Sequence, residues 1–87
     1  MIQLNPRLAD AWNLRGWVRL RRGEFDAAIG ELTRALALDP RHLAALVNRA
    51  AAWSAKKEHA RTLADLEAIA QLLPANADFR EIGRAHV

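Results

Sequence analysis

The feature that most constrains the fold of this 87-residue chain is a repeat with a period of about 34 residues. The stretch LNPRLADAW near the start returns later as LDPRHLAAL, and Pro6, Pro40 and Pro74 are evenly spaced at this same period. A fixed period of this length indicates a repeat architecture, in which each unit buries its apolar face against the next unit. The chain is therefore expected to be a series of equivalent structural units.

Each period contains two stretches with the apolar spacing of an amphipathic helix. In the first period they cover residues 9–21 and 26–38 and are separated by a turn at Gly23, and in the second they cover residues 43–56 and 59–72. Each proline follows the end of a helix, where its missing N–H does no harm. Every unit is thus predicted to be a hairpin of two antiparallel helices.

The pattern resembles the tetratricopeptide repeat family, whose unit of about 34 residues has large, small and proline residues at fixed offsets. The first unit is the better match and departs from the family pattern at Arg15 and Arg19. The second unit departs at Thr62 and Ile69, where the family has alanine, and at Lys57, where the first unit has a glycine. The positions that carry the resemblance are Trp12, Gly16, Phe25, Ala28, Leu32, Ala35 and Pro40 in the first unit and Leu46, Ala50, Trp53, Leu66 and Pro74 in the second.

The resemblance implies an all-α fold, in which antiparallel helix hairpins stack into an α-solenoid with a right-handed superhelical turn. Residues 9–42 and 43–76 are expected to be two repeats, residues 1–8 the end of a preceding repeat's second helix, and residues 77–87 the start of a third repeat. A short array leaves an apolar face open at each end. We therefore interpret the chain as part of a longer solenoid and, should it be complete, we expect self-association through the exposed ends.

The last six residues have a second interpretation. The segment IGRAHV, residues 82–87, can be encoded by ATC GGA AGA GCA CAC GTC, a string common in sequencing adapters. Our hypothesis is that these residues are adapter read-through. Without Arg84, the 13 basic residues fall to 12 against 10 acidic ones, and the formal net charge falls from +3 to +2.

The small residues of the pattern have a packing role. Gly16 and Ala28 allow the two helices of one hairpin to approach closely, and Ala35 makes room for the next hairpin. The larger side chains at the matching positions of the second unit predict a looser second hairpin. At its corner, Lys57 must either adopt left-handed backbone, at a cost of about 1–2 kcal/mol, or force a different turn.

The sequence offers no arrangement suited to catalysis or metal binding. His42, His59 and His86 lack the spacing of metal ligands, so we interpret them as surface or loop residues, and there is no cysteine. Asp65 and Glu67 are two residues apart on a helix and point in different directions, so we interpret both as solvated surface. We predict that the chain is not an enzyme and holds neither a metal nor a cofactor.

In the tetratricopeptide family, the first helices of successive repeats line a concave groove that takes an extended or helical peptide. The resemblance therefore implies another protein or a peptide as the partner. Asn13 and Asn48 carry amides that can bond a peptide backbone, although Asn48 is equally suited to a bond inside the solenoid. An exposed Trp17 would be a hot spot for a ligand side chain, unless a preceding repeat covers it. The matching groove positions are Asn13, Trp17, Arg21, Val47, Asn48 and Ala51.

Three arginines on one face of the first helix, Arg15, Arg19 and Arg22, raise the alternative of nucleic-acid binding. The family pattern places Arg15 and Arg19 on packing positions, where their stems would cover apolar surface and their head groups would meet Glu31 or another acid. Nucleic acid is therefore the less favoured partner.

The sequence thus has two functional interpretations. The leading one is a non-catalytic scaffold that binds a peptide segment of another protein. The alternative is the recognition arm of a larger multidomain enzyme, for example a glycosyltransferase, whose catalytic part lies outside this chain. No apolar run is long enough to span a bilayer. The lack of cysteine suits a reducing compartment without requiring one, so the location stays open with the cytoplasm favoured. The arginine-rich, lysine-poor composition suggests a bacterial source.

Overall fold

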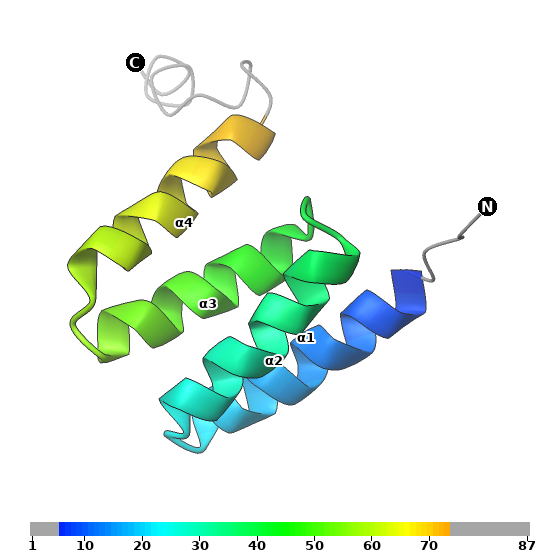
Figure 1. Ribbon diagram of the computed structural model, residues 1–87, viewed down its shortest axis with the longest axis horizontal. Coiled ribbons are helices and arrows are strands. Elements are labelled where there is room, and N and C mark those ends of the chain that lie inside the picture. The colour runs from blue at the N-terminus through cyan, green and yellow to red at the C-terminus, as the bar shows by residue number, and fades with distance from the viewer. Residues whose placement is uncertain (1–5, 74–87) are drawn as a thin grey trace, which may run out of the picture.

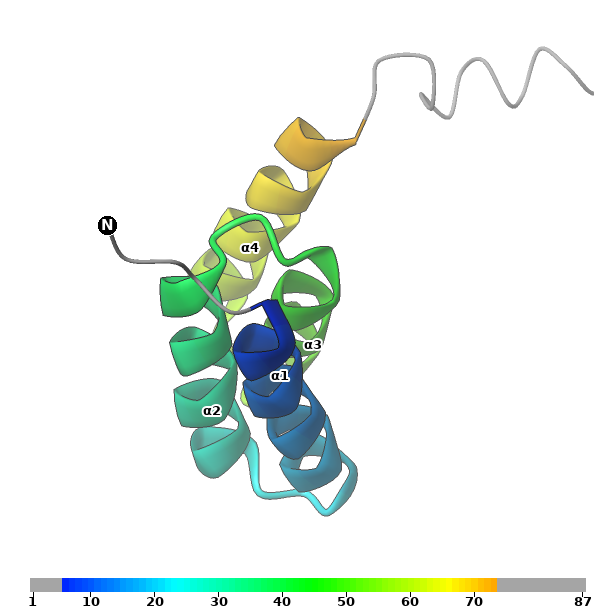
Figure 2. The ribbon, with the colours of Figure 1, turned by 90° about the vertical axis from the view of Figure 1, so that its right-hand side faces the viewer.

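The computed structural model describes residues 6–73, and this part of the chain consists of helices and turns without strands. Successive helices run antiparallel and lie side by side, with the first and the last at opposite ends of the array (Figure 1). Each helix packs against the next one, and the first also contacts the third (Figure 2). The described residues therefore form two stacked helical hairpins, as in an α-solenoid. The helices are α1 (Pro6–Arg21), α2 (Phe25–Leu38), α3 (Leu43–Ala55) and α4 (His59–Leu72).

The ends of the helices differ slightly from those predicted. α1 begins at Pro6, so the prediction that residues 6–8 end a preceding helix is wrong. Proline suits the first turn of a helix, because its missing N–H is not needed there and its φ is already close to the helical value. α2 begins at Phe25 and α3 ends at Ala55, each one residue from the predicted end, while α4 has its predicted bounds. Residues 1–5 and 74–87, with Pro74 and the predicted third repeat, lie outside the described residues.

The two hairpin turns have the same backbone geometry. The N–H of Glu24 donates to the carbonyl of Arg19 at 2.9 Å, and the N–H of Glu58 donates to the carbonyl of Trp53 at 2.9 Å. This six-residue hydrogen bond closes each helix, and the second residue after the helix has a positive φ. That residue is Gly23 in the first turn, with φ 80°, and Lys57 in the second, with φ 62°. The second turn is therefore not reshaped, and Lys57 adopts left-handed backbone.

The first hairpin and α3 enclose the apolar core. Ala28, Leu32 and Ala35 of α2 are fully buried and pack in one cluster with Ala45 and Leu46 of α3. A side chain on Gly16 of α1 would collide with Leu32, because an added Cβ would lie 2.6 Å from its Cγ. The predicted packing roles of these small residues are confirmed. Trp12 is partly buried against the same cluster, and Pro40 lies just beyond the end of α2.

The second hairpin packs less extensively than the first, as its larger side chains predicted. Leu66 is one of the positions that carry the resemblance, yet this residue is 49% exposed. The equivalent Leu32 is enclosed between α1 and α3, whereas on the far side of α4 no described helix covers Leu66. Trp53 is half-buried and stacks with Arg61, whose guanidinium carbon lies 4.9 Å from the ring centre.

None of the described helices is long and apolar enough to cross a membrane.

Candidate functional site

The six predicted groove residues lie on the first helix of each hairpin, α1 and α3, and these two helices contact each other. Their helical spacing places them on one side of each helix, because residues three and four apart are neighbours on a helix surface. A hydrogen bond between Asn13 and Asn48 joins the residues on α1 to those on α3. We call this area the first-helix surface and define it by Asn13, Trp17, Arg21, Val47, Asn48 and Ala51.

The centre of the first-helix surface is a pair of amides. Asn48 Nδ2 donates to Asn13 Oδ1 at 3.0 Å, and both side chains are half-buried. Asn48 therefore has the bond inside the solenoid that the sequence analysis left open. Each amide carries both donor and acceptor groups, so the pair retains the Asn13 NH₂ group and the Asn48 oxygen for further bonds. The amides are positioned by each other and keep a donor and an acceptor.

Two large apolar side chains flank the amide pair. Trp17, one turn after Asn13 on α1, is 45% exposed, and Val47 on α3 is 48% exposed. The guanidinium carbon of Arg21 lies 5.8 Å from the centre of the Trp17 ring. Such a cation–π contact at an exposed site contributes about 0.5–1 kcal/mol and restricts the indole. Ala51 is exposed and leaves space beside Val47.

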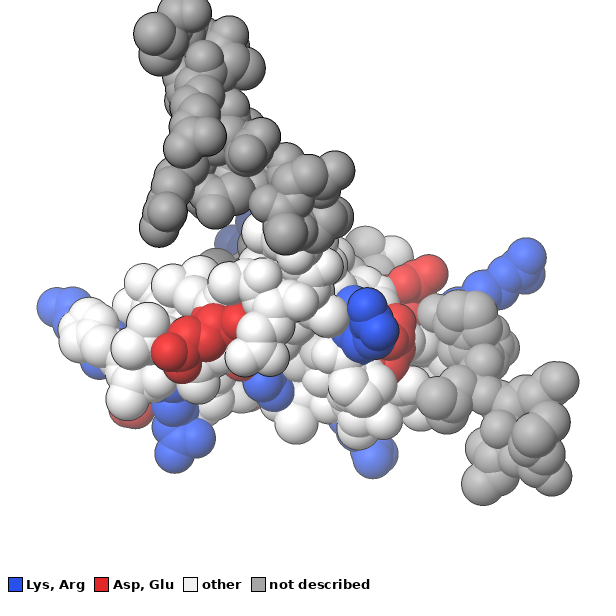
Figure 3. Space-filling model, turned by 90° about the horizontal axis from the view of Figure 1, so that it is seen from above, with Lys and Arg blue, Asp and Glu red and all other residues white. Residues whose placement is uncertain are grey.

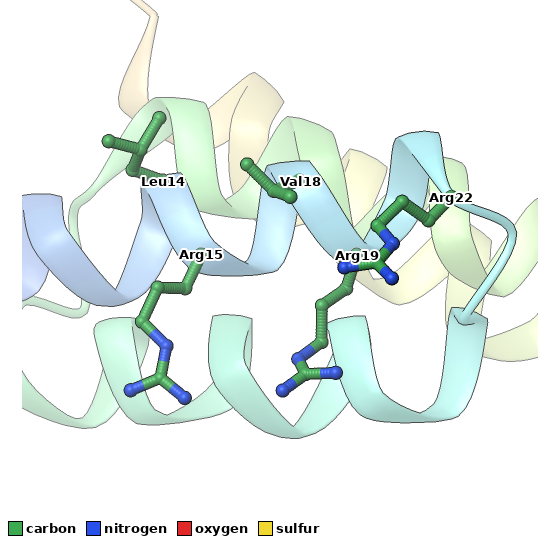
Figure 4. A pocket seen from close by; sticks show the side chains of 5 residues that line it. All are labelled: Leu14, Arg15, Val18, Arg19 and Arg22. Atoms are coloured by element: carbon green, nitrogen blue, oxygen red, sulfur yellow. The ribbon is translucent and has the colours of Figure 1, made fainter.

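A separate hollow of about 280 Å³ lies on α1 and contains none of the predicted groove residues. In Figure 4, Leu14 and Val18 point away from α2, whereas Arg15 and Arg19 point toward it. The hollow is lined by the side chains of Leu14, Arg15, Val18, Arg19 and Arg22.

The arginines of this hollow form ion pairs with acidic residues. Arg15 Nη2 donates to Glu31 Oε1 at 3.0 Å, and Arg19 Nη1 donates to Glu24 Oε1 at 2.8 Å. The expectation that Arg15 and Arg19 meet Glu31 is confirmed, since Arg19 Nε also lies 3.4 Å from Glu31 Oε1. The hydrogen bond that Arg19 donates to Glu24 raises the pKa of Arg19, so this guanidinium stays charged at every ordinary pH. Arg22 pairs with Glu24 at 3.3 Å.

An ion pair in the second hairpin was missed by the sequence analysis. Arg49 binds Asp65 through two parallel hydrogen bonds, Nε to Oδ2 at 2.9 Å and Nη2 to Oδ1 at 2.7 Å, and also donates to Thr33 Oγ1 at 3.3 Å. Asp65 is only 4% exposed, so its interpretation as solvated surface is wrong. The repeat contained the signal, because Arg49 and Asp65 each lie one full period after Arg15 and Glu31.

A histidine thought to be a simple surface or loop residue has a structural role. His42 lies in the loop before α3, where its Nδ1 accepts from the N–H of Ala45 at 3.1 Å and caps the helix. Its Nε2 lies 2.6 Å from Asp10 Oδ1 on α1, so the ring joins the two hairpins and is largely covered. Within residues 6–73, no cluster of three histidine, aspartate or glutamate side chains is arranged to hold a metal ion.

A comparison with protein families matches residues 9–42 to the tetratricopeptide repeat. Residues 9–42 are a tetratricopeptide repeat. The matched segment contains almost all of α1, all of α2 and the loop that leads to α3. Searches among curated proteins and among solved structures found no match. Tetratricopeptide repeats typically act as scaffolds for interactions with other proteins, which suggests a role of this kind for the chain.

Proposed function

We propose that this chain is a non-catalytic scaffold and that its first-helix surface binds a peptide segment of another protein. The observation that supports this proposal is the exposure of Trp17, one turn after Asn13, and of Val47, next to Asn48, beside the bonded pair of amides. Exposed apolar anchors around a few oriented polar groups are typical of sites that bind peptides.

Each part of the surface has a role in this proposal. The indole of Trp17 contacts an apolar side chain of the peptide, because a large rigid ring buries much area at little entropic cost. The remaining amide donor and acceptor of Asn13 and Asn48 bond the peptide backbone, which makes the site tolerant of sequence. The exposed guanidinium of Arg21 favours a peptide with a carboxylate next to its apolar residue.

Nucleic acid is a weaker candidate, because the arginines that suggested it have acidic partners. Arg15, Arg19 and Arg22 each pair with Glu24 or Glu31. On the face in Figure 3, Lys and Arg side chains are scattered among acidic side chains and uncharged surface and form no continuous basic patch. A recognition arm of a larger multidomain enzyme, such as a glycosyltransferase, would use the same surface to hold its substrate protein.

The test is selection of peptides from a displayed random library on the immobilised full chain, followed by affinity measurements on the enriched sequences. We expect the enriched peptides to share an apolar residue and the Trp17→Ala variant to bind them at least about tenfold more weakly. Leu63→Ala is the matched control, because Leu63 is an apolar residue of α4 that is at least as exposed as Trp17 and is not part of the first-helix surface. The proposal fails if no sequence is enriched, or if Trp17→Ala binds the selected peptides as well as the control does.

A further inference from the structure

The outer side of α1 has the character of a packing surface. Ala45 and Ala52 of α3 are fully buried where α3 packs against the first hairpin. The residues one period earlier are Ala11 and Val18, and both are exposed together with Leu14, which is 60% exposed. α1 therefore presents to solvent an apolar strip whose counterparts on α3 are fully buried at Ala45 and Ala52 and partly buried at Asn48.

The outer side of α4 has the complementary character. Leu32 and Ala35 of α2 are fully buried by the contact with α3 and α1. Their equivalents on α4 are Leu66, which is half-exposed, and Ile69, which is partly buried. The outer side of α4 thus resembles the side of α2 that packs on α3. The outer side of α1 resembles the side of α3 on which α2 packs.

We propose that copies of this chain stack head to tail, with α4 of one copy on α1 of the next in the register in which α2 packs on α3. The proposal can be checked against the sequence. Each contact between the first hairpin and α3 has an equivalent between two copies, in which the first-hairpin residue is replaced by the residue one repeat period later and the α3 residue by the residue one period earlier in the next copy. If the surfaces were not complementary, some translated pairs would join like charges or would bury a charge against apolar atoms.

Two polar contacts join α2 to α3, and one of them translates into an ion pair. Within the chain, Arg49 donates to Thr33 at 3.3 Å. The translated pair is Glu67 of one copy and Arg15 of the next copy. Glu67 is exposed on α4, and the side chain of Arg15 is mostly exposed although one of its nitrogens bonds Glu31. A guanidinium has five N–H donors, so Arg15 can bind both carboxylates.

The other polar contact between α2 and α3, between Lys56 and the exposed Asp26, becomes Arg22 of the next copy beside Ala60, where Arg22 keeps Glu24 as its partner.

The polar contacts between α1 and α3 translate into apolar pairs. The Asn13–Asn48 hydrogen bond becomes a contact between Val47 of one copy and Leu14 of the next, two of the most exposed apolar residues described. The contact of His42 with Asp10 becomes one between Ala44 of one copy and Leu8 of the next. Both members of each polar pair are replaced together by apolar residues. This coordinated change is what a second copy of the chain requires.

Such a contact is heterologous, because it joins two different faces, and each added copy leaves the same two faces open at the ends. The assembly therefore grows as an open series that continues the solenoid and does not close as a dimer. It also lengthens the first-helix surface, since α1 and α3 of successive copies lie in one row. This inference goes beyond the proposed peptide binding and does not depend on it, although both use the exposed side chain of Val47.

The test is sedimentation equilibrium of the full 87-residue chain over a wide range of concentrations. We expect the average mass to rise continuously with concentration and to pass the mass of a dimer. Leu14→Glu blocks the α1 face and Leu66→Glu blocks the α4 face, so each variant alone is expected to be monomeric. An equimolar mixture of the two is expected to form a discrete heterodimer, because one free face of each kind remains. Circular dichroism establishes that both variants are folded.

Gly30→Glu is the matched control, since it adds the same charge at a helix position where a Cβ would meet nothing within 4 Å. It is expected to assemble like the unchanged chain. If Leu66→Glu fails to fold, Glu67→Lys replaces it, because a lysine opposite Arg15 of the neighbour is expected to weaken association about tenfold.

Three results would overturn the inference. A chain that stays monomeric at all concentrations would show that α4 is covered within the chain or does not associate. A dimer that does not grow further would indicate contact between identical faces. A mixture of the two blocked variants that forms no heterodimer would exclude the pairing of α4 with α1.

Discussion

Gly16 and Gly30 both lie inside helices, but their surroundings are opposite. An added Cβ on Gly16 would lie 2.6 Å and 2.7 Å from two carbons of Leu32, whereas one on Gly30 would meet nothing within 4 Å. We expect Gly16→Ala to lower the free energy of unfolding by about 1–3 kcal/mol, because the two helices must separate. Gly30→Ala is expected to raise it by up to about 1 kcal/mol through helix propensity. Urea unfolding measures both, and equal effects would contradict the packing role of Gly16.

Equivalent arginines in the two repeats are expected to differ in their importance. Arg49→Ala leaves the buried carboxylate of Asp65 without its cation, so we expect the free energy of unfolding to fall by about 3 kcal/mol. Arg15→Ala leaves Glu31 with Arg19, so a loss of about 1 kcal/mol or less is expected. Chemical denaturation of the two variants at neutral pH tests this difference. Similar losses would mean that Asp65 does not depend on Arg49.

At the scale of elements, the two hairpin turns provide a reciprocal pair of substitutions. Lys57→Gly removes a side chain from left-handed backbone and is expected to stabilise the chain by about 0.5–1 kcal/mol, after the larger entropy loss of glycine is included. Gly23→Lys is expected to destabilise it by a similar amount, because the same turn then carries the same strain. Thermal unfolding of both variants checks the prediction. A destabilised Lys57→Gly variant would show that the lysine side chain contributes a contact that outweighs the strain.

At the scale of the whole molecule, stability is expected to be uneven, because an array of hairpins has contacts only between neighbouring helices. α2 contributes four buried residues, all apolar, whereas the one buried residue assigned to α4 is the carboxylate of Asp65. We expect the amides of α4 to exchange with solvent faster than those of α2. Native-state hydrogen exchange in dilute solution, where copies do not associate, measures this directly. Equal protection in both helices would contradict the gradient.

Much of the fold could be predicted from the sequence. The period, the helical spacing of apolar residues and the small residues at Gly16, Ala28 and Ala35 led to two hairpins with nearly correct bounds. These features depend on contacts within one repeat unit, and local contacts repeat wherever the sequence repeats. The six residues of the first-helix surface were placed on α1 and α3 for the same reason, while their part in binding a peptide stays a prediction.

Only the tertiary structure decided what surrounds each side chain. Asp65 was predicted to be solvated but is buried, because Arg49 pairs with its carboxylate, and Leu66 is exposed, because no described helix covers it. The Asn13–Asn48 bond likewise requires two side chains 35 positions apart to meet. The sequence by itself determined the repeating unit, since its folding depends on local spacing. The tertiary structure determined burial and pairing, since these depend on which neighbour each face meets.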